Sequence, residues 1–149
     1  MGLDISPGVW SGAYGAFSRW RHMLAEAAGY EVAEVVTEVI SSPGRMDYKS
    51  TRPTVLIDWG HIKPENYEGV WAKADEPADP LILLIAHSDC DGHLTPRHAR
   101  LLADRLEELL PLLPDEIMPG HIGDLHAKTR IFIDGCRAAH KANQRLRFA

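Results

Sequence analysis

One stretch of twelve residues, HSDCDGHLTPRH, contains four side chains of the kinds that bind metal ions. They are two imidazoles and two carboxylates, from His87, Asp89, Asp91 and His98. Imidazole nitrogen together with carboxylate oxygen suits a transition metal such as zinc, whereas oxygen ligands alone suit calcium. A transition metal with an open position for water could hydrolyse a phosphoester. The stretch therefore predicts a site for a divalent metal, formed by these four residues.

The order of these residues resembles the calcium-binding loop of the EF-hand. Asp89 and Asp91 match the third and fifth positions of that loop, and Gly92 matches the sixth, where the chain turns sharply. The seventh position supplies a backbone carbonyl, the eighth is apolar and the ninth is polar, as His93, Leu94 and Thr95 are in this chain. The resemblance implies a helix, a calcium loop and a second helix.

The first and last loop positions depart from the EF-hand pattern. His87 and His98 stand where the EF-hand has an acidic residue and a bidentate glutamate, so oxygen ligands for calcium are lost. Three interpretations follow from the residues. The loop binds calcium with a reduced ligand set, it binds a transition metal through its histidines, or it folds without an ion. In the last case Gly92, Asp91 and the helix start at Thr95 are sufficient to form the turn.

Other known catalytic motifs do not occur in the chain. It has no GxSxG, HExxH, Walker or Rossmann pattern, so catalytic residues stay unassigned. The segments MGLDIS and HSDCDG resemble a group of small proteins from actinobacteria and their phages, and this resemblance implies no activity.

The length and composition predict one compact domain over residues 1–149. The chain is 45% hydrophobic and 25% charged, which is typical of a globular protein. Its longest apolar run, Leu81 to Ala86, is far shorter than the about 20 residues needed to span a membrane. No secretion signal is evident, so we expect a soluble cytoplasmic protein in which Cys90 and Cys136 are free thiols.

Charge is unevenly distributed along the chain, whose net charge is -5. Residues 79–125 hold nine acidic residues against three arginines, whereas residues 126–149 hold six bases and one acid. The six bases are Lys128, Arg130, Arg137, Lys141, Arg145 and Arg147. They could bind nucleic acid or an acidic protein, or they could pack against the acidic segment of the same chain. No aromatic residue is interleaved with them before Phe148, which favours the second interpretation.

The elements that would position these residues are mostly predicted helices. Capping residues and apolar periodicity predict helices over 11–28, 30–40, 80–88, 96–110 and 124–145. The segment 45–53 is expected to be a loop and 54–59 a minor strand. The predicted fold is thus mainly α, a single helical domain built around the EF-hand-like helix, loop and helix.

These observations predict a small binding or regulatory protein whose loop 87–98 is structural or holds an ion. The alternatives are a metal-dependent hydrolase that uses His87, Asp89, Asp91 and His98, and an adaptor that binds an acidic partner through the basic C-terminal helix.

Overall fold

The structure is a computed structural model that describes residues 2–39, 48–55, 79–87, 91–115, 117–118 and 123–149. For residues 34–39, 48–55 and 117–118 it describes the backbone alone. The elements in chain order are β1 (Gly2–Ser6), β2 (Trp10–Ala13), α1 (Tyr14–Ala27), β3 (Val32–Val39), β4 (Tyr48–Val55), α3 (Ile82–Ile85), β5 (His93–Leu94), α4 (Pro96–Leu109), the 3-10 helix η1 (Leu110–Leu112), β6 (Ile117–Met118), β7 (Gly123–Asp124), α5 (Leu125–Lys141) and β8 (Leu146–Phe148).

The fold is α/β, so the prediction of a mainly α fold is wrong. An antiparallel sheet of four strands, in the order β2, β1, β8 and β5, packs with the helices. Its central pairing joins the two ends of the described chain, with Ile5 opposite Phe148 and Ser6 opposite Arg147. Because these strands have two to five residues and pair over a long sequence separation, local periodicity gives almost no signal for them.

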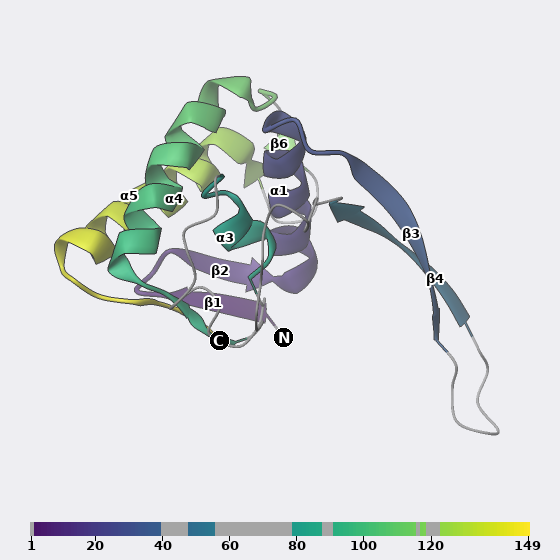
Figure 1. Cartoon of the computed structure of the whole chain (residues 1–149), viewed down its shortest axis with the longest axis horizontal. Coiled ribbons are helices and arrows are strands. Elements are labelled where there is room, and N and C mark those ends of the chain that lie inside the picture. The colour runs from purple at the N-terminus through teal and green to yellow at the C-terminus, as the bar shows by residue number, and fades with distance from the viewer. Residues whose placement is uncertain (1, 40–47, 56–78, 88–90, 116, 119–122) are drawn as a thin grey trace.

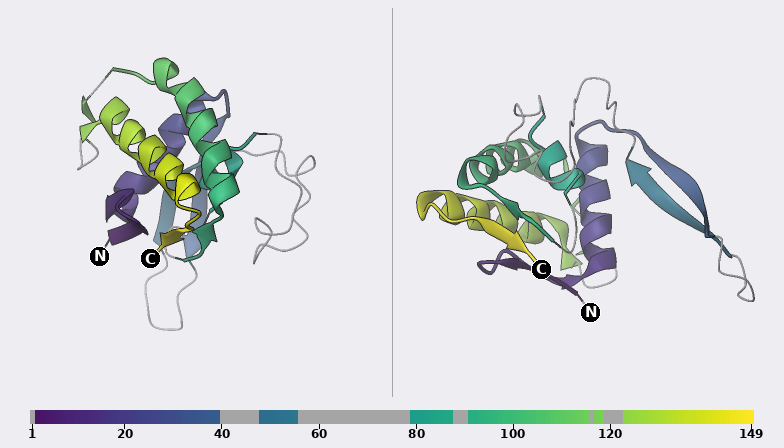
Figure 2. Two further views of the ribbon diagram at one scale, coloured as in Figure 1. Left: turned by 90° about the vertical axis from the view of Figure 1, so that its left-hand side faces the viewer. Right: turned by 60° about the horizontal axis from the view of Figure 1, so that its bottom comes forward.

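The helices cover one face of this sheet, and the other face is exposed (Figures 1 and 2). In β1, Leu3 and Ile5 are buried while Asp4 and Ser6 are exposed. The same alternation in β8 buries Leu146 and Phe148 and exposes the residue between them. Successive side chains of a strand point to opposite faces, so this sheet has an inner face in the core and an outer face in solvent.

Four aromatic rings form the centre of the core. Trp10, Phe17 and Trp20 contact one another, with ring centroids 5.0 to 5.7 Å apart, and Trp20 lies 4.8 Å from Phe132 of α5. The buried indole nitrogen of Trp20 donates a hydrogen bond to Thr129 Oγ1 at 3.0 Å. These contacts fix α1 against α5 and the β1–β2 hairpin.

Helix α1 begins later than predicted. Residues 10–13 form β2 instead of a first helical turn with Ser11 as its cap, and the helix begins at Tyr14. A Cβ atom on Gly2 would lie 2.6 Å from the carbonyl oxygen of Gly12, so glycine allows the two strands to approach closely. The predicted end is confirmed, because the helix ends at Ala27 and Gly29 follows with a φ of +89°.

Strands β3 and β4 form a hairpin that extends away from the helices (Figure 1). The helix predicted over 30–40 is therefore wrong, and so is the loop prediction for residues 48–53. Valine favours strands, and here this preference outweighs the helical spacing of the valines. Of the strand predicted over 54–59, Thr54 and Val55 belong to β4, while residues 56–59 lie outside the described residues.

The predicted helices in the second half of the chain are confirmed, although α3 is shorter than the predicted 80–88 and α5 ends at Lys141, before the predicted end at residue 145. Thr95 caps α4 by accepting a hydrogen bond from the His98 N–H at 3.2 Å, with Pro96 in the first turn. Asp124 caps α5 by accepting from the Ala127 N–H at 3.1 Å. Within the described parts of the chain, no helix is long and apolar enough to cross a membrane.

Candidate functional site

The loop predicted to bind a metal connects α3 and α4 and contributes a strand to the sheet. Its residues 93–94 form β5, which pairs with 146–147 of β8. The Phe148 N–H donates to the carbonyl oxygen of Gly92 at 3.0 Å, and Gly92 has a φ of +95°. Ser88, Asp89 and Cys90 lie outside the described residues, so the likeness to a complete EF-hand loop stays a prediction.

His87, the first residue of this loop, is buried and only 7% exposed. Its ring stacks on Phe148, with centroids 3.9 Å apart and planes inclined by 24°. The Nε2 atom lies 3.3 Å from the carbonyl oxygen of His93, and a Cβ atom on Gly92 would lie 3.2 Å from the ring. The His87 ring therefore takes part in joining the loop to β8.

Arg21 of α1 binds the backbone carbonyl of His87. Its Nη1 atom donates to the carbonyl oxygens of His87 at 2.8 Å and of Leu84 at 3.4 Å, at the end of α3. The guanidinium also lies over the Phe17 ring, 4.6 Å from its centroid. Arg21 lies within the helix predicted over 11–28 and was not among the candidate functional residues. A charged residue at a core-facing position was the available signal.

Two of the other predicted metal ligands, His98 and Asp91, are described, and each lies in a different environment. His98 is buried in the first turn of α4, and the exposed Asp91 accepts a hydrogen bond from the Gly92 N–H at 2.7 Å. Among the residues that the structure describes, no three His, Cys, Asp or Glu side chains are arranged to hold a metal ion. His87, Asp91 and His98 thus do not form a metal site by themselves. A site completed by Asp89 stays a prediction.

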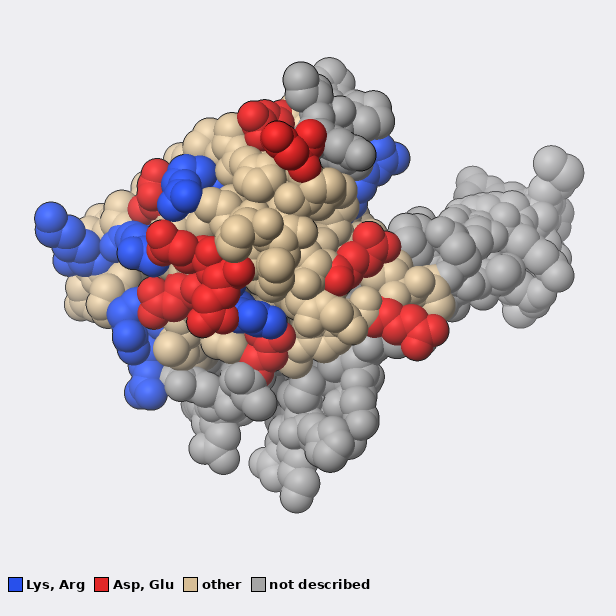
Figure 3. Space-filling view, turned by 90° about the horizontal axis from the view of Figure 1, so that it is seen from above, with Lys and Arg blue, Asp and Glu red and all other residues tan. Residues whose placement is uncertain are grey.

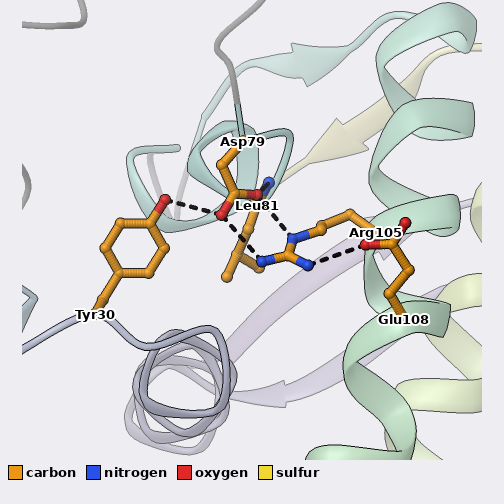
Figure 4. A network of polar contacts seen from close by, with 5 residues as sticks. All are labelled: Tyr30, Asp79, Leu81, Arg105 and Glu108. Atoms are coloured by element: carbon orange, nitrogen blue, oxygen red, sulfur yellow. Dashed lines mark hydrogen bonds and ion pairs between the residues drawn. The ribbon is translucent and has the colours of Figure 1, made fainter.

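The Tyr30 hydroxyl and the Cys136 thiol are two other potentially reactive groups in the described chain, and both have a role in packing. Asp79 accepts hydrogen bonds from Tyr30, from the Leu81 N–H and from Arg105, which also pairs with Glu108 (Figure 4). Burial and the bond to Asp79 raise the pKa of Tyr30 to about 12. Cys136 is a free thiol, as predicted, and burial raises its pKa. Neither group is disposed for proton transfer or nucleophilic attack near neutral pH.

Half of the predicted basic residues are engaged by the chain itself. Arg130 pairs with Glu107 of α4 at 3.5 Å, and Arg137 pairs with Glu107 and with Asp104. Lys128 lies over the Trp10 ring, 4.3 Å from its centroid. The interpretation that the basic segment packs against its acidic neighbour is confirmed for the part that faces α4.

The other three bases are exposed and lie beyond this contact. Lys141, Arg145 and Arg147 form no ion pair with any residue in the described ranges. Figure 3 shows acidic and basic side chains intermixed over the helices, and basic ones alone at the end of the molecule where α5 finishes. Burial, followed by the charges of Arg145, His87 and Arg147, lowers the pKa of His93. We call His93, Lys141, Arg145 and Arg147 the basic end.

Part of the basic end belongs to the outer face of the sheet. In the strand register, Arg147 lies between Ser6 of β1 and His93 of β5. Directly opposed residues of antiparallel strands point to the same face, so the three side chains form a row across three strands. Sequence reasoning identified the arginines but did not include His93 or Ser6, because only the pairing of β8 brings them together.

The chain matches no family model, no curated protein and no solved structure.

Proposed function

We propose that the chain is a small binding protein that takes an acidic partner at its basic end. One observation supports the proposal above all. Arg130 and Arg137 are neutralised by acids of α4, whereas Lys141, Arg145 and Arg147 have no acidic partner within the described residues. The net charge of the protein is -5, but a local cluster of uncompensated positive charge still creates a field that attracts polyanions.

The loop 87–98 supports this function as a structural connection. It provides β5, whose His93 lies in the basic end, and it contacts Phe148 through His87 and Gly92. In this proposal the loop keeps β8 in register, and β8 carries Arg147. His87 and His98 then serve packing, and no chemical step is assigned to them.

The test is binding of labelled polyanions, namely heparin, polyglutamate and a nucleic acid duplex, at low and moderate salt. The triple variant Lys141→Gln, Arg145→Gln and Arg147→Gln should weaken binding at least tenfold at low salt, because it removes the uncompensated charges. The matched control is Lys128→Gln, Arg130→Gln and Arg137→Gln, which removes the same charge from the same segment and should change binding less than threefold. Equal losses in the two variants, or no binding of any probe, would refute the proposal.

The metal-binding hypothesis has a separate test. Because His87 stacks on Phe148 and its Nε2 faces a backbone carbonyl, we expect neither zinc nor calcium to raise the melting temperature. Protein purified without an affinity tag is titrated with each ion and followed by circular dichroism. A stabilisation that is absent in Asp89→Asn, the carboxylate outside the described residues, would instead establish the predicted four-residue site.

A further inference from the structure

The outer face of the sheet continues from the basic end as a surface of small and polar residues. Its exposed or partly exposed positions are Gly2, Asp4, Ser6, Ser11, Ala13, His93 and Arg147. In Figure 2 (right), the strands β1, β2 and β8 lie along the lower side of the molecule, below the helices. None of these residues is a large apolar one, so the face has no bulky side chain that could enter a pocket on a partner. Protein interfaces depend on such buried aromatic or aliphatic anchors.

The two large hydrophobic residues that are exposed in the described chain lie elsewhere. They are Leu112 of η1 and Ile131 of α5. The face that holds the cations therefore lacks apolar anchors, and the apolar residues lie away from it. Binding at this face must come from charge and hydrogen bonds, which is how proteins bind the phosphates of nucleic acids.

The row on this face has the donors that phosphate contacts use. Ser6 supplies a hydroxyl, Arg147 a guanidinium and His93 an imidazole, on three adjacent strands about 4.8 Å apart. Arg145 comes two residues before Arg147, about 6.6 Å along an extended chain. Guanidinium groups bind phosphate oxygens in a bidentate manner, and serine is a frequent second donor. The row thus offers successive donors to successive phosphates of one strand.

We infer that the acidic partner is a nucleic acid, held by its phosphates along the row of Ser6, Arg147 and His93 and by Arg145, without reading of its bases. The inference rests on the function proposed above and specifies its partner. Stacking on bases requires exposed aromatic rings, and Phe148, which follows Arg147 in β8, is 3% exposed and covered by His87. Asp4 is exposed on the same face, and its negative charge would repel a phosphate backbone that passes close to it.

The experiment measures fluorescence anisotropy of two labelled duplexes of unrelated sequence and of labelled polyglutamate, over a salt series. We expect both duplexes to bind with equal affinity and more tightly than polyglutamate. In Arg145→Gln with Arg147→Gln, the slope of log affinity against log salt should fall by about two for the duplexes. The control Arg130→Gln with Arg137→Gln changes the net charge equally and should keep the slope. Asp4→Asn should strengthen duplex binding two- to fivefold.

The outcomes separate this inference from the proposed function. Polyglutamate binding as tight as duplex binding would overturn the nucleic acid partner and leave the acidic partner standing. Strong preference for one duplex would overturn recognition through phosphates alone. Absence of binding to every probe would overturn both. A slope reduced equally by the control pair would show that the attraction is general and not located at this row.

Discussion

Gly92 shows how one backbone position can determine the packing of a functional loop. Its φ of +95° disfavours any side chain, and an added Cβ would also lie 3.2 Å from the His87 ring. The carbonyl of this same residue accepts from the Phe148 N–H. A side chain at residue 92 would therefore face both an unfavourable backbone conformation and a steric conflict, at the point where the loop meets β8.

We predict that Gly92→Ala lowers the free energy of unfolding by about 2 to 3 kcal/mol, from left-handed strain and displacement of His87. The matched control is Gly29→Ala, with a φ of +89° and no atom within 4 Å of the added Cβ, which should lose only about 1 kcal/mol. Urea denaturation measures both. Equal losses would mean that the His87 ring moves aside without effect.

The two core tryptophans differ in their hydrogen bonds. Trp20 Nε1 donates to Thr129, whereas the buried Trp10 Nε1 has no hydrogen-bond acceptor within the described chain. Trp20→Phe leaves a buried acceptor without its donor, so it should destabilise by about 1 kcal/mol more than Trp10→Phe, which loses a similar volume. Thermal and urea unfolding of both variants check this difference. A larger loss in Trp10→Phe would contradict it.

His93 predicts a pH dependence of stability. Burial and the charges of Arg145, His87 and Arg147 lower its pKa in the folded state, so the unfolded state binds the proton more readily. Stability should therefore fall as the pH drops below the unfolded value of about 6.5, with the loss complete below the lowered folded pKa. In urea titrations, the free energy of unfolding of the His93→Gln variant should decrease less between pH 7 and pH 5 than that of the unchanged protein. A parallel decline in the two proteins would exclude this role.

At the scale of elements, local signals predict α4 and α5 well. Thr95 and Asp124 cap these helices as their sequence contexts indicate, and the apolar stripes that follow them are buried. The same local reasoning failed for 30–40, where valines at helical spacing form β3. It also failed for the ends of the chain, because β1 and β8 are stabilised by each other and not by their neighbours in sequence.

The contact of the β1–β2 turn with α5 gives a prediction at this scale. A Cβ atom on Gly135 would lie 2.5 Å from Val9 Cγ2, so the turn occupies the space that a side chain on the helix would need. Alanine favours an isolated helix by about 1 kcal/mol over glycine. Gly135→Ala should nevertheless destabilise the protein by about 1 to 3 kcal/mol through overpacking.

A double-mutant cycle tests the cause of that loss. Val9→Ala removes the methyl group that would lie at 2.5 Å and one of the two atoms at 3.1 Å, so Gly135→Ala should lose most of its destabilising effect in the Val9→Ala background. Chemical denaturation of the four proteins gives the coupling free energy. Additive effects would show that the helix and the turn shift apart instead.

At the scale of the whole molecule, the folded arrangement determines which charges stay uncompensated. The sequence shows six bases after residue 126 but cannot divide them into engaged and uncompensated ones. Antiparallel packing of α4 and α5 brings Arg130 and Arg137 to Glu107, and the chain then passes beyond α4 before reaching Arg145. Candidate residues could thus be predicted from composition, whereas the binding surface could not.

The position of β8 in the sheet has a consequence for synthesis of the protein. It is the last element of the chain, yet it lies between β1 and β5 and forms two of the three strand pairings. While the chain emerges from the ribosome, the β1–β2 hairpin can form early, but β1 and β5 each lack a neighbour until residues 146–148 are released. Closure of the sheet, and with it assembly of the row that contains Arg147, therefore waits until β8 has left the ribosome.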